Sequence, residues 1–166
     1  MMFQELNAQN QKPSMSQKMI IKQQLINAPV ERVWWQWTTS DGLKTFFGAD
    51  NKMELDIGGP YEIYFSMDIP EGKRGSEGCK VLSFIPNKMI SFSWNAPPEY
   101  PKIRNGGYNP WVVVEFDQQG ENATLVTLTH LGFKTGGNWD KVYDYFIPAW
   151  DAVMKWLVDS NLKQEN

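Results

Sequence analysis

The chain contains a single histidine, His130, within the stretch LVTLTHLGF that runs from Leu125 to Phe133. Because an imidazole titrates near neutral pH, histidine is the side chain most often used as a general acid or base. A catalytic base also needs an orienting group and a reacting proton within reach, and no Asp or Glu stands at a spacing that promises either. We therefore interpret His130 as a cavity-wall residue that contacts polar atoms of a ligand, with a catalytic base as the alternative.

The other residues that could take part in chemistry exclude more functions than they support. One cysteine and one histidine allow no intrachain disulfide and cannot supply the four thiolate or imidazole ligands of a structural zinc ion. Cys79 stands among strand-like residues, which indicates a small buried hydrophobe rather than a reactive thiol. Gly58 and Gly59 join two predicted strands and open no helix, so they indicate a hairpin turn and not a phosphate loop. We predict no metal site, no cofactor and no catalytic residue.

The residues around His130 alternate between two faces of a strand predicted at 124–131. Val126, Leu128 and His130 share the apolar face, which places the imidazole inside the domain. Glu115 belongs to the strand predicted beside it, but it alternates with Val114 and its neighbours and therefore faces water. No carboxylate is thus expected beside the imidazole.

Composition and charge narrow the class of protein. A chain of 166 residues fits one ordinary domain, and 14% aromatic residues can fill a core or line a cavity. The net charge of -3, with scattered Lys and Arg, excludes the basic surface with which a protein binds nucleic acid. No apolar run reaches the roughly 18 residues of a membrane span, and residues 1–16 lack the apolar centre of a signal peptide. We expect a cytoplasmic protein; a signal peptide removed ahead of residues 1–16 would instead give an exported form.

The pattern of apolar residues predicts the elements that position these side chains. Residues 18–26 form a first strand, Pro29 opens a short helix, and Ser40 caps a second one. Six further strands are predicted at 49–56, 61–67, 79–85, 89–94, 111–117 and 124–131. A helix over 138–162 presents one apolar face, with a kink or a restart at Pro148.

These elements predict an α+β fold. A seven-stranded curved antiparallel sheet wraps around the long C-terminal helix, and two short helices lie between the first and second strands. The single domain spans residues 17–166, and residues 1–16 form a polar N-terminal arm.

Several stretches carry a family resemblance: INAPVERVWWQWT, ELDIGGPYEIYF, KVLSFIPNKMISFSW, and ATLVTLTHLGF followed by PAWDAVMKWL. Over residues 18–162 the chain resembles the START-like or SRPBCC superfamily, and within it the single-domain proteins named after the activator of the Hsp90 ATPase. This resemblance implies a helix-grip fold. The chain departs from the pattern at Phe47, where a Trp is usual, at Pro148, where a Gly is usual, and in a longer loop over residues 95–110.

The resemblance implies that a small hydrophobic or amphipathic molecule binds between the sheet and the last helix, without defined catalysis. The residues expected to contact it are Phe46, Tyr61, Phe65, Phe92, Trp94, Val114, Leu128, His130, Trp139, Tyr143 and Trp150. The loop over residues 94–111 is expected to act as a lid, with Tyr100, Ile103 and Tyr108 as its apolar side chains, or else to be a solvated extension. A cyclase or hydratase that uses His130, a chaperone-interacting module and a homodimer stay open as alternatives.

Overall fold

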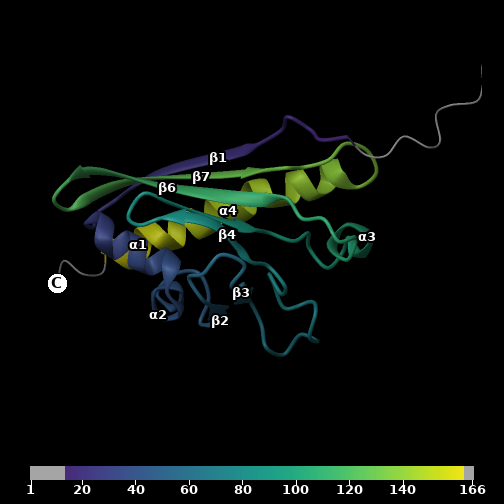
Figure 1. The fold of residues 1–166 in the computed structure, drawn as a ribbon, viewed down its shortest axis with the longest axis horizontal. Coiled ribbons are helices and arrows are strands. Elements are labelled where there is room, and N and C mark those ends of the chain that lie inside the picture. Colours follow the sequence, from purple (N-terminus) through teal and green to yellow (C-terminus); the bar gives the residue numbers. More distant parts are fainter. Residues whose placement is uncertain (1–13, 163–166) are drawn as a thin grey trace, which may run out of the picture.

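The computed structural model describes residues 14–162, in which a long helix lies along one face of an antiparallel sheet (Figure 1). The elements are β1 (Ile20–Ile26), α1 (Val30–Thr38), α2 (Ser40–Lys44), β2 (Asp50–Met53), β3 (Tyr61–Tyr64), β4 (Val81–Ile85), β5 (Met89–Ser93), α3 (Pro101–Arg104), β6 (Trp111–Gly120), β7 (Ala123–Leu131) and α4 (Trp139–Leu162). Seven strands, two short helices after β1 and a long C-terminal helix confirm the predicted helix-grip fold.

The seven strands form a five-stranded sheet and a two-stranded ribbon. The sheet has the order β1-β7-β6-β5-β4, and the ribbon pairs β2 with β3. Backbone hydrogen bonds join the two parts, because the Tyr61 amide donates to the Cys79 carbonyl at 2.8 Å and the Ser76 amide donates to the Ile63 carbonyl at 3.0 Å. The segment that precedes β4 thereby connects the ribbon to the sheet.

The central strands have the predicted alternation. Leu128 pairs in register with Val114, and His130 pairs with Val112; all four side chains are buried. Glu115 is exposed on the opposite face. The inward orientation predicted for His130 is therefore confirmed, and so is the absence of Glu115 from its surroundings.

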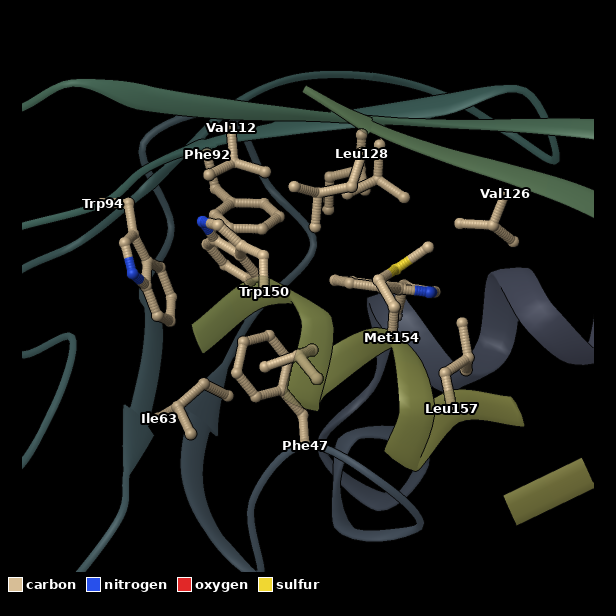
Figure 2. Close-up of a cluster of buried hydrophobic side chains, with 14 of the residues drawn as sticks. Phe47, Ile63, Phe92, Trp94, Val112, Val126, Leu128, Trp150, Met154 and Leu157 are labelled. Atoms are coloured by element: carbon tan, nitrogen blue, oxygen red, sulfur yellow. The ribbon is translucent and has the colours of Figure 1, made fainter. Parts of the chain in front are cut away.

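The last helix, α4, buries one face against the sheet. Its buried residues are Trp139, Val142, Phe146, Trp150, Val153, Met154, Leu157 and Asn161. Figure 2 shows part of the apolar cluster that they form with side chains of the sheet. Each large apolar side chain buried in this way contributes about 1.5–3 kcal/mol to stability. The helix continues through Pro148, whose side chain is exposed, so the predicted restart is wrong, whereas a bend there stays a prediction.

Several boundaries differ from those predicted: β2 ends at Met53, β4 begins at Val81, and β6 continues to Gly120. The third strand ends at Tyr64 rather than at residue 67, because the chain then turns into the loop that leads to β4; Phe65 and Met67 are consequently about half exposed. Thr39, not Ser40, caps α2, since its hydroxyl accepts a hydrogen bond from the Gly42 amide at 2.9 Å. The proline-rich loop after β5 is not devoid of regular structure, because it contains α3.

The end of the predicted N-terminal arm is also paired. Met15 forms an antiparallel bridge with Lys134, and the Ser16 amide donates to the Phe133 carbonyl at 2.7 Å. Residues 14–16 therefore extend the sheet region beside β7 instead of forming a free arm. The remainder of the predicted arm, residues 1–13, lies outside the described residues.

Candidate functional site

A cavity of about 310 Å³ opens between α4, the end of β5 and the two loops that flank the sheet at this point. Its lining is formed by Phe47, Phe65, Ile69, Lys73, Arg74, Gly75, Trp94, Asn95, Ala96, Pro97, Pro98, Glu99, Arg104, Tyr145, Phe146, Ala149, Trp150 and Val153. The volume lies at the lower end of the range typical of small-molecule sites. The cavity is largely apolar inside, with charged groups from the loops at its rim.

Three aromatic rings that are labelled in Figure 2, those of Phe47, Trp94 and Trp150, line this cavity. The ring centroids of Trp94 and Trp150 are 5.2 Å apart, and Phe47 lies 5.6 Å from Trp94 and 6.0 Å from Trp150. These separations are typical of aromatic pairs that stabilise one another. The wall therefore holds its shape through contacts within the protein.

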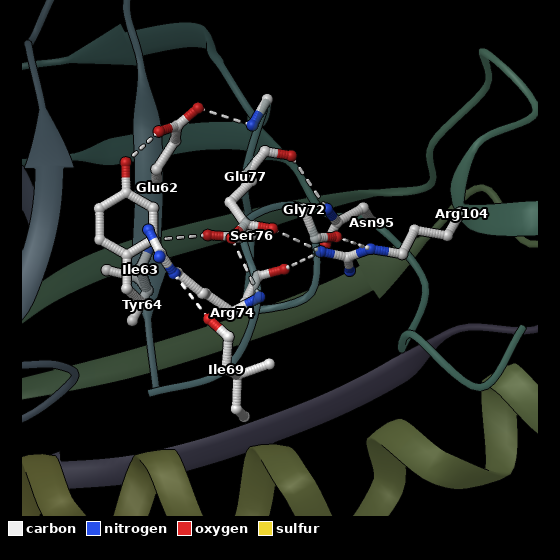
Figure 3. A network of polar contacts seen from close by, with 12 residues as sticks. Glu62, Ile63, Tyr64, Ile69, Gly72, Arg74, Ser76, Glu77, Asn95 and Arg104 are labelled. Atoms are coloured by element: carbon white, nitrogen blue, oxygen red, sulfur yellow. Dashed lines mark hydrogen bonds and ion pairs between the residues drawn. The ribbon is translucent and has the colours of Figure 1, made fainter. Parts of the chain in front are cut away.

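The side chain of Arg104, shown in Figure 3, holds together the two loops at the rim of the cavity. Its guanidinium donates hydrogen bonds to the carbonyls of Gly72 at 2.9 Å, Gly75 at 2.8 Å and Ala96 at 2.7 Å, and it forms an ion pair with Glu77 at 3.0 Å. The Arg104 side chain is only 5% exposed. One residue of the loop after β5 thus fixes both loops that frame the opening.

Charged residues of the loop after β3 lie at the rim. Arg74 donates from Nε to the Ile69 carbonyl at 2.9 Å, and its backbone amide donates to the Glu77 carboxylate at 3.0 Å. Lys73, beside it, is exposed. Glu99 lies on the other loop of the rim and is exposed as well. The opening therefore carries two cations and one anion besides the Arg104–Glu77 pair.

His130 lies behind the aromatic wall and does not line the cavity. Its Nδ1 accepts a hydrogen bond from Nε1 of Trp150 at 2.9 Å, and its ring packs between Phe133 and Phe146. Burial lowers the pKa of His130 to about 3, so the imidazole is neutral with its proton on Nε2. Nε2 has no hydrogen-bond partner among residues 14–162. The imidazole therefore orients Trp150, whose ring faces the cavity.

Of the predicted ligand-contacting residues, Phe65, Trp94 and Trp150 line this cavity. Phe92, Val114 and Leu128 lie in the closed core of the sheet, as does Tyr61, which stacks on Phe92 and donates to the Trp37 carbonyl at 2.9 Å. Trp139 is buried near the start of α4, and Tyr143 donates to the Met19 carbonyl at 3.3 Å. Phe46 lines a second, open groove of about 500 Å³ on the far side of Phe47 and Phe65.

The predicted lid loop lies at the mouth of the cavity, but different residues face it. Pro97, Pro98 and Glu99 line the cavity, together with Arg104. Tyr100 and Ile103 instead pack against the core, and Tyr108 donates to the Gly132 carbonyl at 2.7 Å while its ring contacts Trp139. Movement of this loop stays a prediction.

Several cavity residues were not anticipated from the sequence. The sequence marks Phe47 only as a departure from the family pattern, whereas its neighbour Phe46 is among the residues expected to contact a ligand. Phe146 and Val153 belong to the predicted apolar face of the last helix, so their spacing of four and three from Trp150 was the available signal. Lys73 and Arg74 lie in an irregular loop, where no periodicity indicates which side chains meet.

Other kinds of site find no support in the part of the chain that the structure describes. No group of three or more His, Cys, Asp or Glu residues within 14–162 could hold a metal ion. Cys79 is buried, and desolvation raises the pKa of its thiol to about 12, as expected for a structural cysteine. Among the described helices, none has the length and apolar character needed to cross a membrane.

Solved structures with the same fold come from several bacteria. The protein MLL2253 from Mesorhizobium loti superposes with a TM-score of 0.70 at 17% identity, covering 90% of this chain and 100% of its own. The Aha1 dimer from Colwellia psychrerythraea gives 0.63 at 21%, covering 90% and 99%. CalU16 from Micromonospora echinospora gives 0.61 at 21%, covering 86% and 74%. At these identities the likeness establishes the fold alone.

Comparison with curated proteins yields no match. A family model, by contrast, covers most of the domain, from residue 27 to residue 159, and it is described as Activator of Hsp90 ATPase homolog 1-like protein. The matched range includes the two short helices, all strands after the first, and most of the long helix. The chain therefore belongs to the AHSA1 family of Activator of Hsp90 ATPase homolog 1-like proteins.

Proposed function

We propose that this protein binds a small hydrophobic or amphipathic molecule in the cavity beside Trp94 and Trp150. The observation that carries the proposal is a largely apolar cavity of about 310 Å³ whose lining includes the charged residues Lys73, Arg74, Glu99 and Arg104. Concave apolar sites with a few polar groups at defined positions are typical of small-molecule binding. A plain core would bring these rings into contact without leaving such a space.

The size of the cavity limits the ligand. The cavity volume of about 310 Å³ lies at the lower end of the range of roughly 300–1,000 Å³ that is typical of ligand sites. We infer that a small ligand places its apolar part inside and leaves a polar end at the rim. Displacing water from Phe47, Trp94 and Trp150 would supply most of the binding free energy.

The loop over residues 94–111 is proposed to control access to this cavity. Pro97, Pro98 and Glu99 stand at its mouth, and Arg104 ties the loop to the neighbouring loop. Release of a ligand would then require the Arg104 contacts to loosen. The loop is part of the binding site in this proposal, rather than a solvated extension.

Two alternatives receive less support. A cyclase or hydratase that uses His130 needs the imidazole to reach a substrate, but Trp150 and Phe146 lie between it and the cavity, and its pKa of about 3 makes it a weak base. A chaperone-interacting role follows only from the family's name, and the dimer is a property of the Colwellia psychrerythraea protein. We therefore favour ligand binding.

The proposal is tested by filling the cavity. Ala149 lines it from α4, so Ala149→Phe should occupy the space and weaken the binding of 1-octanol at least tenfold, measured by titration calorimetry. Lys141→Phe adds the same ring to an exposed position of α4 outside the cavity and serves as the control. Native mass spectrometry of gently purified protein would identify a retained ligand. If octanol does not bind the unchanged protein, or binds both variants equally, the cavity is not a binding site.

A further inference from the structure

We propose that the ligand of this cavity is an anionic amphiphile, whose acidic group is held at the rim by Lys73 and Arg74. This inference rests on the proposed function and adds the charge of the ligand to it. It is carried by the charges at this site, where two cations of one loop are among the lining residues of a largely apolar cavity.

The two cations are available to a ligand. Within residues 14–162, neither Lys73 nor Arg74 forms an ion pair with a carboxylate. Arg74 uses Nε to contact the Ile69 carbonyl, and the structure gives its two terminal nitrogens no protein partner (Figure 3). A guanidinium with free terminal nitrogens suits a carboxylate or a similar anion, because two parallel N–H donors match two oxygens.

The third cation of the rim has a different role. The Arg104 guanidinium donates to three carbonyls and to the Glu77 carboxylate, and its side chain is 5% exposed. Four of its five N–H donors are therefore used to hold the loops together, and its charge is neutralised by Glu77. This division within one rim leaves Lys73 and Arg74 as the cations that act on a ligand.

The remaining charged residue of the rim, Glu99, bears on the preference for an anionic ligand. Glu99 stands on the other loop and is exposed. Burial, and to a smaller extent the negative charge of Glu99, raises the pKa of the Tyr145 hydroxyl, which also lines the cavity. Two cations against one carboxylate leave an excess of one positive charge, which favours an anion over a cation.

Three probes with the same chain test the proposal: octanoate, 1-octanol and octylammonium, each titrated by calorimetry at low and at moderate salt. We expect octanoate to bind at least fivefold more tightly than either of the others, with an advantage that shrinks as salt rises. The double variant Lys73→Gln, Arg74→Gln should remove this advantage, so that the ratio of octanoate affinity to octanol affinity falls to about one. Glu99→Gln should raise the affinity for octanoate two- to threefold, because it removes a repulsive charge.

Lys102 provides the matched control, since it is an exposed cation of α3 outside the cavity lining, and Lys102→Gln should change none of the three affinities. Equal binding of the three probes would overturn the anion inference while the proposed function stands. Tighter binding of octylammonium would overturn it in favour of a cation held by Glu99. Failure of all three probes to bind would overturn both proposals.

Discussion

Two buried polar networks of this protein have opposite consequences for the space around them. The first, the helix network, joins α1 to the end of α4 through Arg32, Gln36, Ser160 and Asn161; Asn161 accepts from Arg32 and donates to Gln36, each at 2.9 Å. The second, the rim network, consists of Arg104, Glu77 and the carbonyls of Gly72, Gly75 and Ala96 (Figure 3). The helix network closes one end of the fold, whereas the rim network surrounds an opening.

The difference lies in which groups need a partner. Helices satisfy their own backbone, so the helix network consists largely of bonds between side chains and brings two regular elements together. The loops around the cavity have carbonyls that no sheet or helix pairs, and a single guanidinium supplies donors for three of them. A cavity can persist there because one long side chain, rather than close packing of elements, keeps the loops in place.

The largest effect is expected from Arg104→Gln, which breaks the rim network. Loss of the guanidinium removes donors from three carbonyls and leaves the largely buried Glu77 carboxylate without its cation, at a cost of about 3 kcal/mol in unfolding free energy. Octanol should also dissociate faster, because the loops at the mouth lose their connection. Urea unfolding and stopped-flow dissociation measure the two effects. A stable variant with unchanged release would show that the rim does not depend on Arg104.

A smaller effect, on stability alone, is expected from Asn161→Ala in the helix network. The change removes the donor to the side-chain amide oxygen of Gln36 and the acceptor for the Arg32 guanidinium. We expect it to lower the unfolding free energy by about 2 kcal/mol. The affinity for octanol should stay the same, since Asn161 lies outside the cavity lining. A clear loss of affinity would mean that the two networks are coupled through α4.

The smallest effect concerns His130, which belongs to neither network and has one hydrogen bond in an apolar core. Its pKa is about 3 in the folded protein and near 6.5 when unfolded, so between these values the unfolded state binds more protons. The unfolding free energy should therefore fall as pH decreases from 6.5 toward 3, by at most about 1.4 kcal/mol per pH unit from this group.

His130→Asn isolates this contribution, because the amide can accept from Trp150 but does not titrate. Urea unfolding of both proteins at pH 7.5, 6.5 and 5.5 should show that, below pH 6.5, the unfolding free energy of the variant rises relative to that of the unchanged protein. Parallel pH profiles would mean that the imidazole binds its proton as readily in the folded state as in the unfolded state, which would revive the catalytic alternative for His130.

The sequence determined the elements and their inward faces. Alternation in residues 124–131 predicted that Val126, Leu128 and His130 are buried, and the spacing of Trp139 to Leu157 predicted the face of α4 that packs on the sheet. Such patterns reflect the repeat of a strand or a helix, which is a local property of the chain. The fold class and the family followed from the order of these elements.

Only the tertiary structure decided where the cavity lies and which charges surround it. Periodicity identifies an inward side chain but does not distinguish a packed core, such as that around Phe92, from a wall with space beside it, such as Trp94. The positions of Lys73, Arg74 and Arg104 depend on hydrogen bonds between loops that are far apart in the sequence. No local repeat encodes those contacts, because irregular backbone takes its shape from the partners that satisfy its carbonyls.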